Sequence, residues 1–69
     1  MNFELIVDLI IKMHSKVKLD ELLSIPIPLE DWHSLTHEEL IYISGLMDRY
    51  GMELEFEGDY VFITYNNFI

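Results

Sequence analysis

The chain has no cysteine among its 69 residues and only three glycines. Without thiols it forms no disulfide bond and no thiolate metal site. It has no glycine-rich phosphate loop, and two of its glycines are explained by a helix end and a turn. The apolar run at 5–11 is interrupted by Asp8 and is too short to span a bilayer. Since Glu4 stands where a secretory signal is basic, we expect a cytoplasmic protein without a membrane segment.

Basic residues are scarce and unevenly placed. Three of the four lie before position 19, and Arg49 alone follows them. From Leu19 onward, eleven carboxylates face that one arginine, a formal balance of −10. A surface this negative repels a phosphate backbone and attracts basic proteins. We therefore expect a basic protein partner and no direct binding to nucleic acid.

The length predicts a single small domain over residues 1–69. Such a domain buries only about 60% of its unfolded surface and is marginally stable alone. The apolar fraction is nevertheless 51%. This combination indicates a compact core together with apolar surface that a partner or a second copy covers. A homodimer is therefore kept as an alternative.

The first half of the chain predicts two helices and a short strand. Apolar residues dominate positions 3–14, where a polar residue recurs every fourth position. This predicts a helix buried on most sides, as a central helix or a dimer seam. Positions 17–19 suit a short strand and 20–23 a short helix. Pro26 and Pro28 then force an extended segment, which we interpret as a hinge.

The second half predicts a long helix and a hairpin. Thr36 and Glu39 form a capping box, and Gly51 is placed to end the helix that follows. The inward face of this helix is apolar and comprises Leu40, Ile43, Leu46, Met47 and Tyr50. Gly45, in mid-helix, indicates a close helix approach, either to the first helix or across a dimer. After the helix, apolar and glutamate residues alternate over 52–57, and 60–65 returns with high β propensity.

The length of the hairpin loop decides which residues share a face. With a two-residue loop at Gly58, the inner face is apolar and comprises Met52, Leu54, Val61 and Ile63. The outer face then holds two aromatic residues beside acids, namely Tyr60 and Phe62 with Glu53, Glu55 and Glu57. A loop of odd length reverses the second strand and breaks this arrangement. Aromatic anchors with charged rims are typical of protein interfaces.

The order of helix, short strand, short helix, long helix and hairpin resembles the winged helix-turn-helix family, in the style of biotin-repressor-type domains. The family's strand and second helix correspond to Val17-Lys18-Leu19-Asp20-Glu21-Leu22-Leu23. Its recognition helix and wing correspond to 42–51 and 52–65. The resemblance implies an α+β fold. The family's recognition helix is basic and polar, whereas this one carries Glu38, Glu39 and Asp48, and the wing tip is Glu57-Gly58-Asp59.

A second resemblance is to acyl carrier proteins. It rests on Leu29-Glu30-Asp31-Trp32, on Leu35-Thr36-His37, and on the helix that runs into Tyr50-Gly51-Met52-Glu53-Leu54. The family attaches its cofactor arm to a serine in an Asp-Ser-Leu triplet. Here that position is Thr36, and the nearby Ser34 follows His33 instead of an aspartate. The resemblance implies helices after residue 52, where the alternation predicts strands.

No catalytic, metal or cofactor site is expected. His33 and His37 have a spacing that can hold zinc, but the helix start at Thr36 separates them. Pairs of glutamates lie at expected exposed positions, and no nucleophile lies beside a base. Trp32 is expected to fill the core, with an interface anchor as the alternative. His14 is expected to complement the dipole at the end of the first helix.

The sequence therefore predicts a small, acidic, non-catalytic protein-binding module. Its expected action is that of a DNA-mimic inhibitor or adaptor, of the kind that phages and mobile elements encode, on a basic nucleic-acid-binding protein. The alternatives are an acyl-carrier-like domain, and a winged-helix domain for dimerisation or transcriptional regulation. The predicted interface residues are Trp32, Glu38, Glu39, Glu53, Glu55, Glu57, Asp59, Tyr60 and Phe62.

Overall fold

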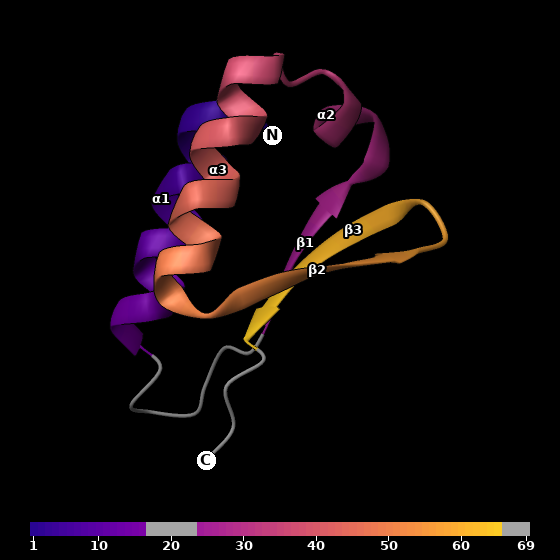
Figure 1. The fold of residues 1–69 in the computed structure, drawn as a ribbon. Coiled ribbons are helices and arrows are strands. Elements are labelled where there is room, and N and C mark those ends of the chain that lie inside the picture. Colours follow the sequence, from indigo (N-terminus) through magenta and orange to yellow (C-terminus); the bar gives the residue numbers. More distant parts are fainter. Residues whose placement is uncertain (17–23, 66–69) are drawn as a thin grey trace.

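The computed structural model describes residues 1–16 and 24–65 and has an α+β fold (Figure 1). The elements follow in the order α1 (Phe3–Lys16), β1 (Ser24–Pro28), α2 (Leu29–His33), α3 (His37–Tyr50), β2 (Met52–Glu57) and β3 (Tyr60–Tyr65). This confirms the predicted fold class and order of elements. None of the helices in this part of the chain is long and apolar enough to cross a membrane.

The three strands form one antiparallel sheet with β3 in the centre, in the order β1-β3-β2. β2 and β3 are joined by the two-residue loop Gly58-Asp59, and Gly58 adopts a left-handed conformation with φ of 60°. Leu54 pairs with Ile63 and Glu55 pairs with Phe62. The loop length and the register therefore confirm the predicted division of the hairpin into an apolar face and an acidic, aromatic face.

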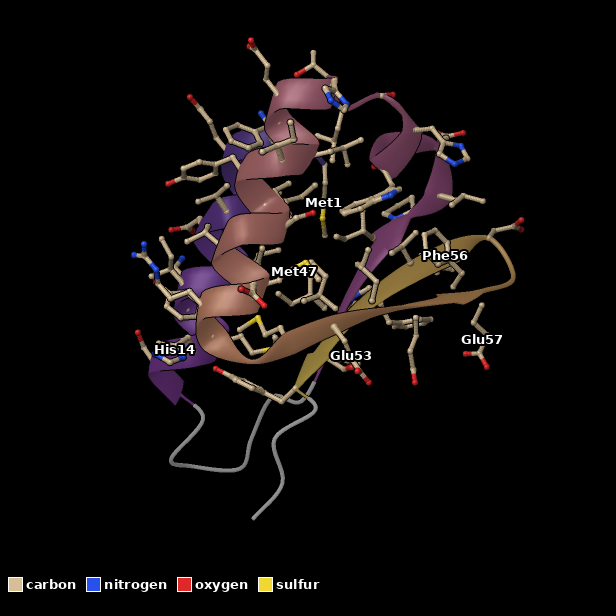
Figure 2. The ribbon with its side chains drawn as sticks, viewed as in Figure 1. Met1, His14, Met47, Glu53, Phe56 and Glu57 are labelled. Atoms are coloured by element: carbon tan, nitrogen blue, oxygen red, sulfur yellow. The ribbon has the colours of Figure 1, made fainter. Side chains whose placement is uncertain are left out.

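Helices α1 and α3 cover the apolar face of the sheet, so the molecule has two layers with the core between them (Figure 1). The core comprises Ile6, Ile10, Met13, Ile25, Ile27, Trp32, Ile43, Met47, Met52, Val61, Ile63 and Tyr65. Toward the hairpin tip, away from α1 and α3, Phe56 lies on the side of β2 that faces the helices and is 63% exposed (Figure 2). The opposite face of the sheet is covered by no helix of the described chain.

The segment interpreted as a hinge is instead strand β1, which pairs with β3. Ile25 and Ile27 point into the core, whereas Pro26 faces outward opposite Phe62. Prolines are tolerated here because β1 is an edge strand, where a missing N–H leaves no neighbour unpaired. The predicted extended geometry is thus confirmed, and the interpretation as a hinge was wrong, since the segment is the strand β1. The strand and helix predicted at 17–19 and 20–23 lie outside the described residues.

Helix α3 begins and ends as its sequence predicts. The Glu39 N–H donates to Thr36 Oγ1 at 3.1 Å, and the Thr36 N–H donates to Glu39 Oε1 at 2.9 Å. At the other end, Gly51 closes the helix with φ of 72°. Ile43 and Met47 are buried against the core. The capping box therefore fixes where the helix starts, and the apolar positions Ile43 and Met47 decide which of its faces meets the sheet.

Helix α1 departs from its prediction, because it is buried along one face only. Ile6, Ile10 and Met13 are fully buried, but Leu5 and Ile11 are 43% and 44% exposed. The helix also continues to Lys16, two residues beyond the predicted end. It is not the central helix expected from its composition. Its outward side leaves apolar surface uncovered.

Replacing Thr36 by alanine removes one half of the capping box and leaves the Glu39 N–H without its partner. We expect a loss of about 1 kcal/mol in the free energy of unfolding, measured by urea denaturation. Glu39→Gln is the matched control, because glutamine also completes a capping box. If Thr36→Ala leaves the urea midpoint unchanged, the box does not stabilise α3.

Candidate functional site

The outward face of the sheet carries three aligned rows of side chains. We call it the outer sheet face and define it by Ser24, Pro26, Pro28, Glu53, Glu55, Glu57, Tyr60, Phe62 and Thr64. Each row crosses the strands in the order β1, β3, β2, as in Pro26–Phe62–Glu55 and Pro28–Tyr60–Glu57. Figure 2 shows Glu53 and Glu57 on the side of β2 away from the helices. The face is therefore banded, with prolines, then aromatic rings, then glutamates.

Tyr60 and Phe62 form the central band of this face. Tyr60 is 46% exposed and Phe62 is half-buried between its neighbours. Their ring centroids are 6.2 Å apart with the planes tilted by 36°. Aromatic side chains have only two side-chain torsions, so they lose little conformational entropy when a partner covers them, and the Tyr60 hydroxyl adds a polar group. Tyr60 and Phe62 thus both lie on the outer side of the sheet, as the two-residue loop predicts.

The ion pairs of Asp8 and Asp31 lie away from the acidic edge of the outer sheet face. Those pairs join Lys12 Nζ to Asp8 at 3.0 Å and the Met1 amino group to Asp31. Glu55 and Glu57 are exposed and enter neither pair. Charges of one sign held side by side on a solvent-exposed strand create a negative potential that extends about one Debye length from the surface.

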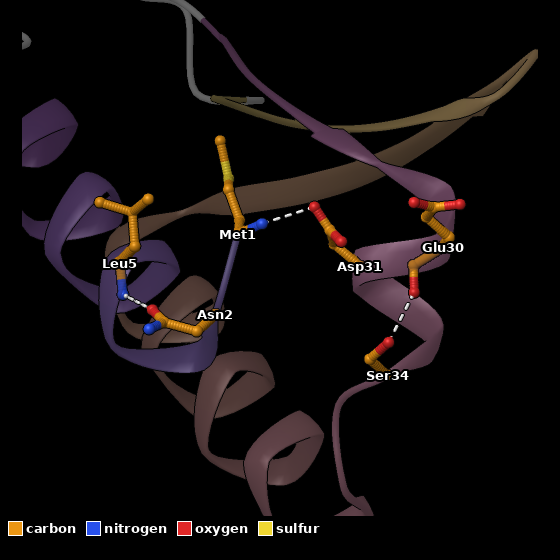
Figure 3. A network of polar contacts seen from close by, with 6 residues as sticks. All are labelled: Met1, Asn2, Leu5, Glu30, Asp31 and Ser34. Atoms are coloured by element: carbon orange, nitrogen blue, oxygen red, sulfur yellow. Dashed lines mark hydrogen bonds and ion pairs between the residues drawn. The ribbon is translucent and has the colours of Figure 1, made fainter.

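Asp31 takes part in an ion pair within the chain, which Figure 3 shows together with the neighbouring hydrogen bonds. Its carboxylate forms an ion pair with the Met1 amino group. At the start of α1, the Leu5 N–H donates a hydrogen bond to Asn2 Oδ1 at 2.9 Å. In α2, the Ser34 hydroxyl donates to the Glu30 carbonyl, also at 2.9 Å. The pair of Met1 with Asp31 joins the chain before α1 to α2, so Asp31 has a structural role.

The predicted interface residues do not form one surface. Glu53, Glu55, Glu57, Tyr60 and Phe62 share the outer sheet face, and Asp59 lies in the hairpin loop at its end. Glu38 and Glu39 lie instead in the first turn of α3, beside α1. Trp32 is 8% exposed in α2 and belongs to the core. Its predicted role as a core side chain is confirmed, and it is not one of the exposed residues that a partner could contact.

The two histidines with zinc-like spacing lie on different helices. His33 is the last residue of α2 and His37 is the first of α3, and both are exposed. Within residues 1–16 and 24–65, no three histidine or acidic side chains come together in an arrangement that can hold a metal ion. The histidines therefore do not form a metal centre in this part of the molecule.

A cluster that sequence reasoning missed joins the ends of α1, α3 and β3. The His14 ring stacks on Tyr50 with centroids 4.0 Å apart, and His14 Nδ1 lies 3.0 Å from the Tyr65 hydroxyl. Burial, and to a lesser extent the neighbouring Tyr50, raises the pKa of Tyr65. His14 and Tyr65 are 51 positions apart, so no local pattern signals the contact. Its role is to hold three elements together.

Comparison with protein-family models, with curated proteins and with solved structures finds no match to this chain. The order of elements is nevertheless winged-helix-like, including β1 beside the hairpin in the sheet. The exposed positions of α3 include Glu38 and Asp48, as its sequence indicates. The acyl carrier resemblance implies helices after residue 52, whereas β2 and β3 occupy that region. The described residues therefore do not have the fold of that family.

Tyr65 makes the stability of the fold sensitive to alkaline pH. Its pKa is raised in the folded state, so above about pH 10 the unfolded chain releases a proton that the folded chain retains. Unfolding is then favoured, and we expect the free energy of unfolding to fall as pH rises above about 10. Urea denaturation between pH 8 and 11 measures this, with Tyr65→Phe as control. Equal alkaline losses in both proteins would contradict the assignment to Tyr65.

Proposed function

We propose that this chain is a non-catalytic, acidic protein-binding module that acts as a DNA mimic toward a basic nucleic-acid-binding protein. One observation supports the proposal above others: an exposed row of glutamates on β2 lies beside the Tyr60 and Phe62 rings on a sheet face that no helix of the described chain covers. The row would occupy a groove that otherwise takes phosphates, and the rings would supply the desolvated anchor.

The spacing of the glutamates decides how much of the binding energy charge can supply. Alternate residues of a strand are about 7 Å apart. One DNA strand carries a charge every 3.4 Å along the axis, so the row has about half the axial charge density of a single strand. Charge alone is thus a weak substitute for a duplex. The aromatic band is needed to give a specific complex.

The two components of the outer sheet face would act at different stages of binding. The formal net charge of −9 and the glutamate edge raise the rate of encounter with a positive surface. Once the surfaces meet, exclusion of water around Tyr60 and Phe62 slows dissociation. This division predicts that charge substitutions and aromatic substitutions change different rate constants.

Direct reading of DNA is a less suitable function for this chain. A winged-helix protein inserts its α3 equivalent into the major groove. Here that helix exposes Glu38 and Asp48, and Arg49 is its one arginine or lysine. A groove rich in phosphates repels such a helix. The winged-helix-like shape therefore serves, in our proposal, to present acids to a protein.

Glu55→Lys tests the charge component. The target is a basic protein captured from host extract by the immobilised chain and then purified. We expect duplex DNA to compete for this protein, and we expect Glu55→Lys to weaken binding at least tenfold, mainly through a slower association rate. Asp48→Lys is the matched control, because it changes the net charge equally outside the outer sheet face. Equal weakening by both substitutions, or absence of competition by DNA, would contradict DNA mimicry.

Tyr60→Ala tests the aromatic component. Because Tyr60 is exposed, we expect the fold to survive, with a urea midpoint close to that of the wild type. We expect the dissociation rate from the same target to rise about tenfold or more, with little change in the dependence of affinity on salt. Surface plasmon resonance at two salt concentrations measures both quantities. An unchanged dissociation rate would show that the aromatic band lies outside the interface.

A further inference from the structure

A second surface lies between the N-terminal parts of α1 and α3. A groove of about 600 Å³ runs there, with a floor formed by the apolar side chains of Phe3, Val7, Ile11 and Tyr42. The Phe3 and Tyr42 rings meet edge to face with centroids 5.6 Å apart. Tyr42 is 54% exposed, so the floor is open to solvent. The groove is thus an apolar surface of the kind that a partner covers.

Carboxylates from both helices surround this floor. Glu4 and Asp8 project from α1, and Glu38 and Glu39 from the first turn of α3. Asp8 pairs with Lys12, and Glu39 completes the capping box. Glu4 and Glu38 are exposed and make no hydrogen bond or ion pair with the described residues. An occupant of the groove therefore meets an apolar floor with a negative rim.

The apolar surface continues along α3 past Tyr42. A smaller groove of about 270 Å³ is lined by Ile41, Tyr42, Gly45, Leu46 and Arg49. Apart from its chain neighbours and the backbone of its own helix, a methyl group added at Gly45 would meet no atom of the described residues within 4 Å, so no packing contact among them requires glycine there. The predicted close approach of α1 at Gly45 is thus ruled out. Glycine in mid-helix costs about 1 kcal/mol relative to alanine. The alternative that the sequence analysis left is an approach across a dimer, and contact with a different molecule would explain the glycine equally well.

We propose that the groove between α1 and α3 binds a basic amphipathic helix of a partner protein. The floor residues Phe3, Val7 and Ile11 are spaced by four along α1, so they extend over about 12 Å. That length matches two turns of a docked helix, which would place apolar side chains at i, i+3 or i+4, and i+7 on this floor. Lysine or arginine beside that stripe would face Glu4 and Glu38.

Charge selects this occupant over a second copy of the chain. Two copies would bring together two bodies of formal charge −9, with acidic rims in contact. A basic helix reverses the sign of that interaction. The proposal is also independent of the outer sheet face. The groove belongs to the helical layer, and the glutamate row lies on the opposite side of the sheet. The tests of the two proposals can therefore give different outcomes.

The test uses three synthetic peptides of 18 residues. The first is an amphipathic helix of leucine and lysine, the second is a scrambled peptide of the same composition, and the third replaces lysine by glutamate. Binding is followed by methyl and amide NMR shifts of the whole chain at about 0.15 M salt. We expect the first peptide alone to bind strongly and to shift Val7, Ile11 and Tyr42. Equal binding of the scrambled peptide, or shifts centred on Glu55 and Phe62, would overturn the proposal.

Two substitutions separate the groove from general electrostatic attraction. Glu38→Gln removes a rim charge, and Asp48→Asn removes an equal charge from α3 outside both grooves. We expect the first to weaken binding of the leucine–lysine peptide about threefold or more and the second to leave it nearly unchanged. Equal effects would overturn the proposal. Analytical ultracentrifugation shows whether the free chain dimerises. A dimer that Tyr42→Ala dissociates would overturn the proposal, because a second copy of the chain would then occupy the groove.

We expect Gly45→Ala to raise the stability of the free chain and to lower its affinity for the peptide. Because alanine favours helix and meets no neighbour, we expect the urea midpoint of the free chain to rise. We expect affinity for the leucine–lysine peptide to fall at least threefold, since the added methyl group fills the smaller groove where the docked helix continues. A variant that is more stable and binds equally well would exclude Gly45 from the docking surface.

Discussion

The position of β3 between β1 and β2 is the constraint on which the rest of this structure depends. Its side chains alternate between Val61 and Ile63 in the core and Tyr60 and Phe62 outside. Because the side-chain period of a strand is two, a slip of one residue would place glutamates of β2 in the core and expose apolar side chains. The Gly58-Asp59 loop prevents this slip. The same register aligns β1 so that its isoleucines are buried and its prolines lie on the outer sheet face.

The acids of the molecule lie in several different places. Asp31, Asp8 and Glu39 interact with groups of the chain itself, at α2, along α1 and at the start of α3. The exposed glutamates of β2 lie on the outer sheet face, and Glu4 and Glu38 on the opposite, helical side. A chain with few cations thus has two negative surfaces, each beside exposed aromatic side chains. In our account it is an adaptor with two faces for basic partners.

Local signals predicted those parts of the structure that depend on neighbouring residues. Thr36, Glu39 and Gly51 mark the ends of α3, and the alternation around Gly58 predicts the hairpin and its faces. The hinge prediction at Pro26 and Pro28 was wrong, because pairing with a distant strand overrides the local preference of proline-rich segments for loops. The composition of α1 suggested burial on most sides, but two layers leave one side of it open. The His14–Tyr65 contact and the groove near Tyr42 join residues far apart in sequence, which no local pattern encodes.

The central claim is that the glutamates of β2 and the aromatic band share one uncovered face of the sheet. Solution NMR of the free chain with a soluble paramagnetic relaxation agent tests this most directly. The account predicts cross-strand contacts linking Phe62 to both Glu55 and Pro26, together with strong relaxation of the Tyr60 ring and weak relaxation of Ile63. Contacts from Phe62 to Leu54 in place of Glu55, or protection of Tyr60 from the agent, would contradict it.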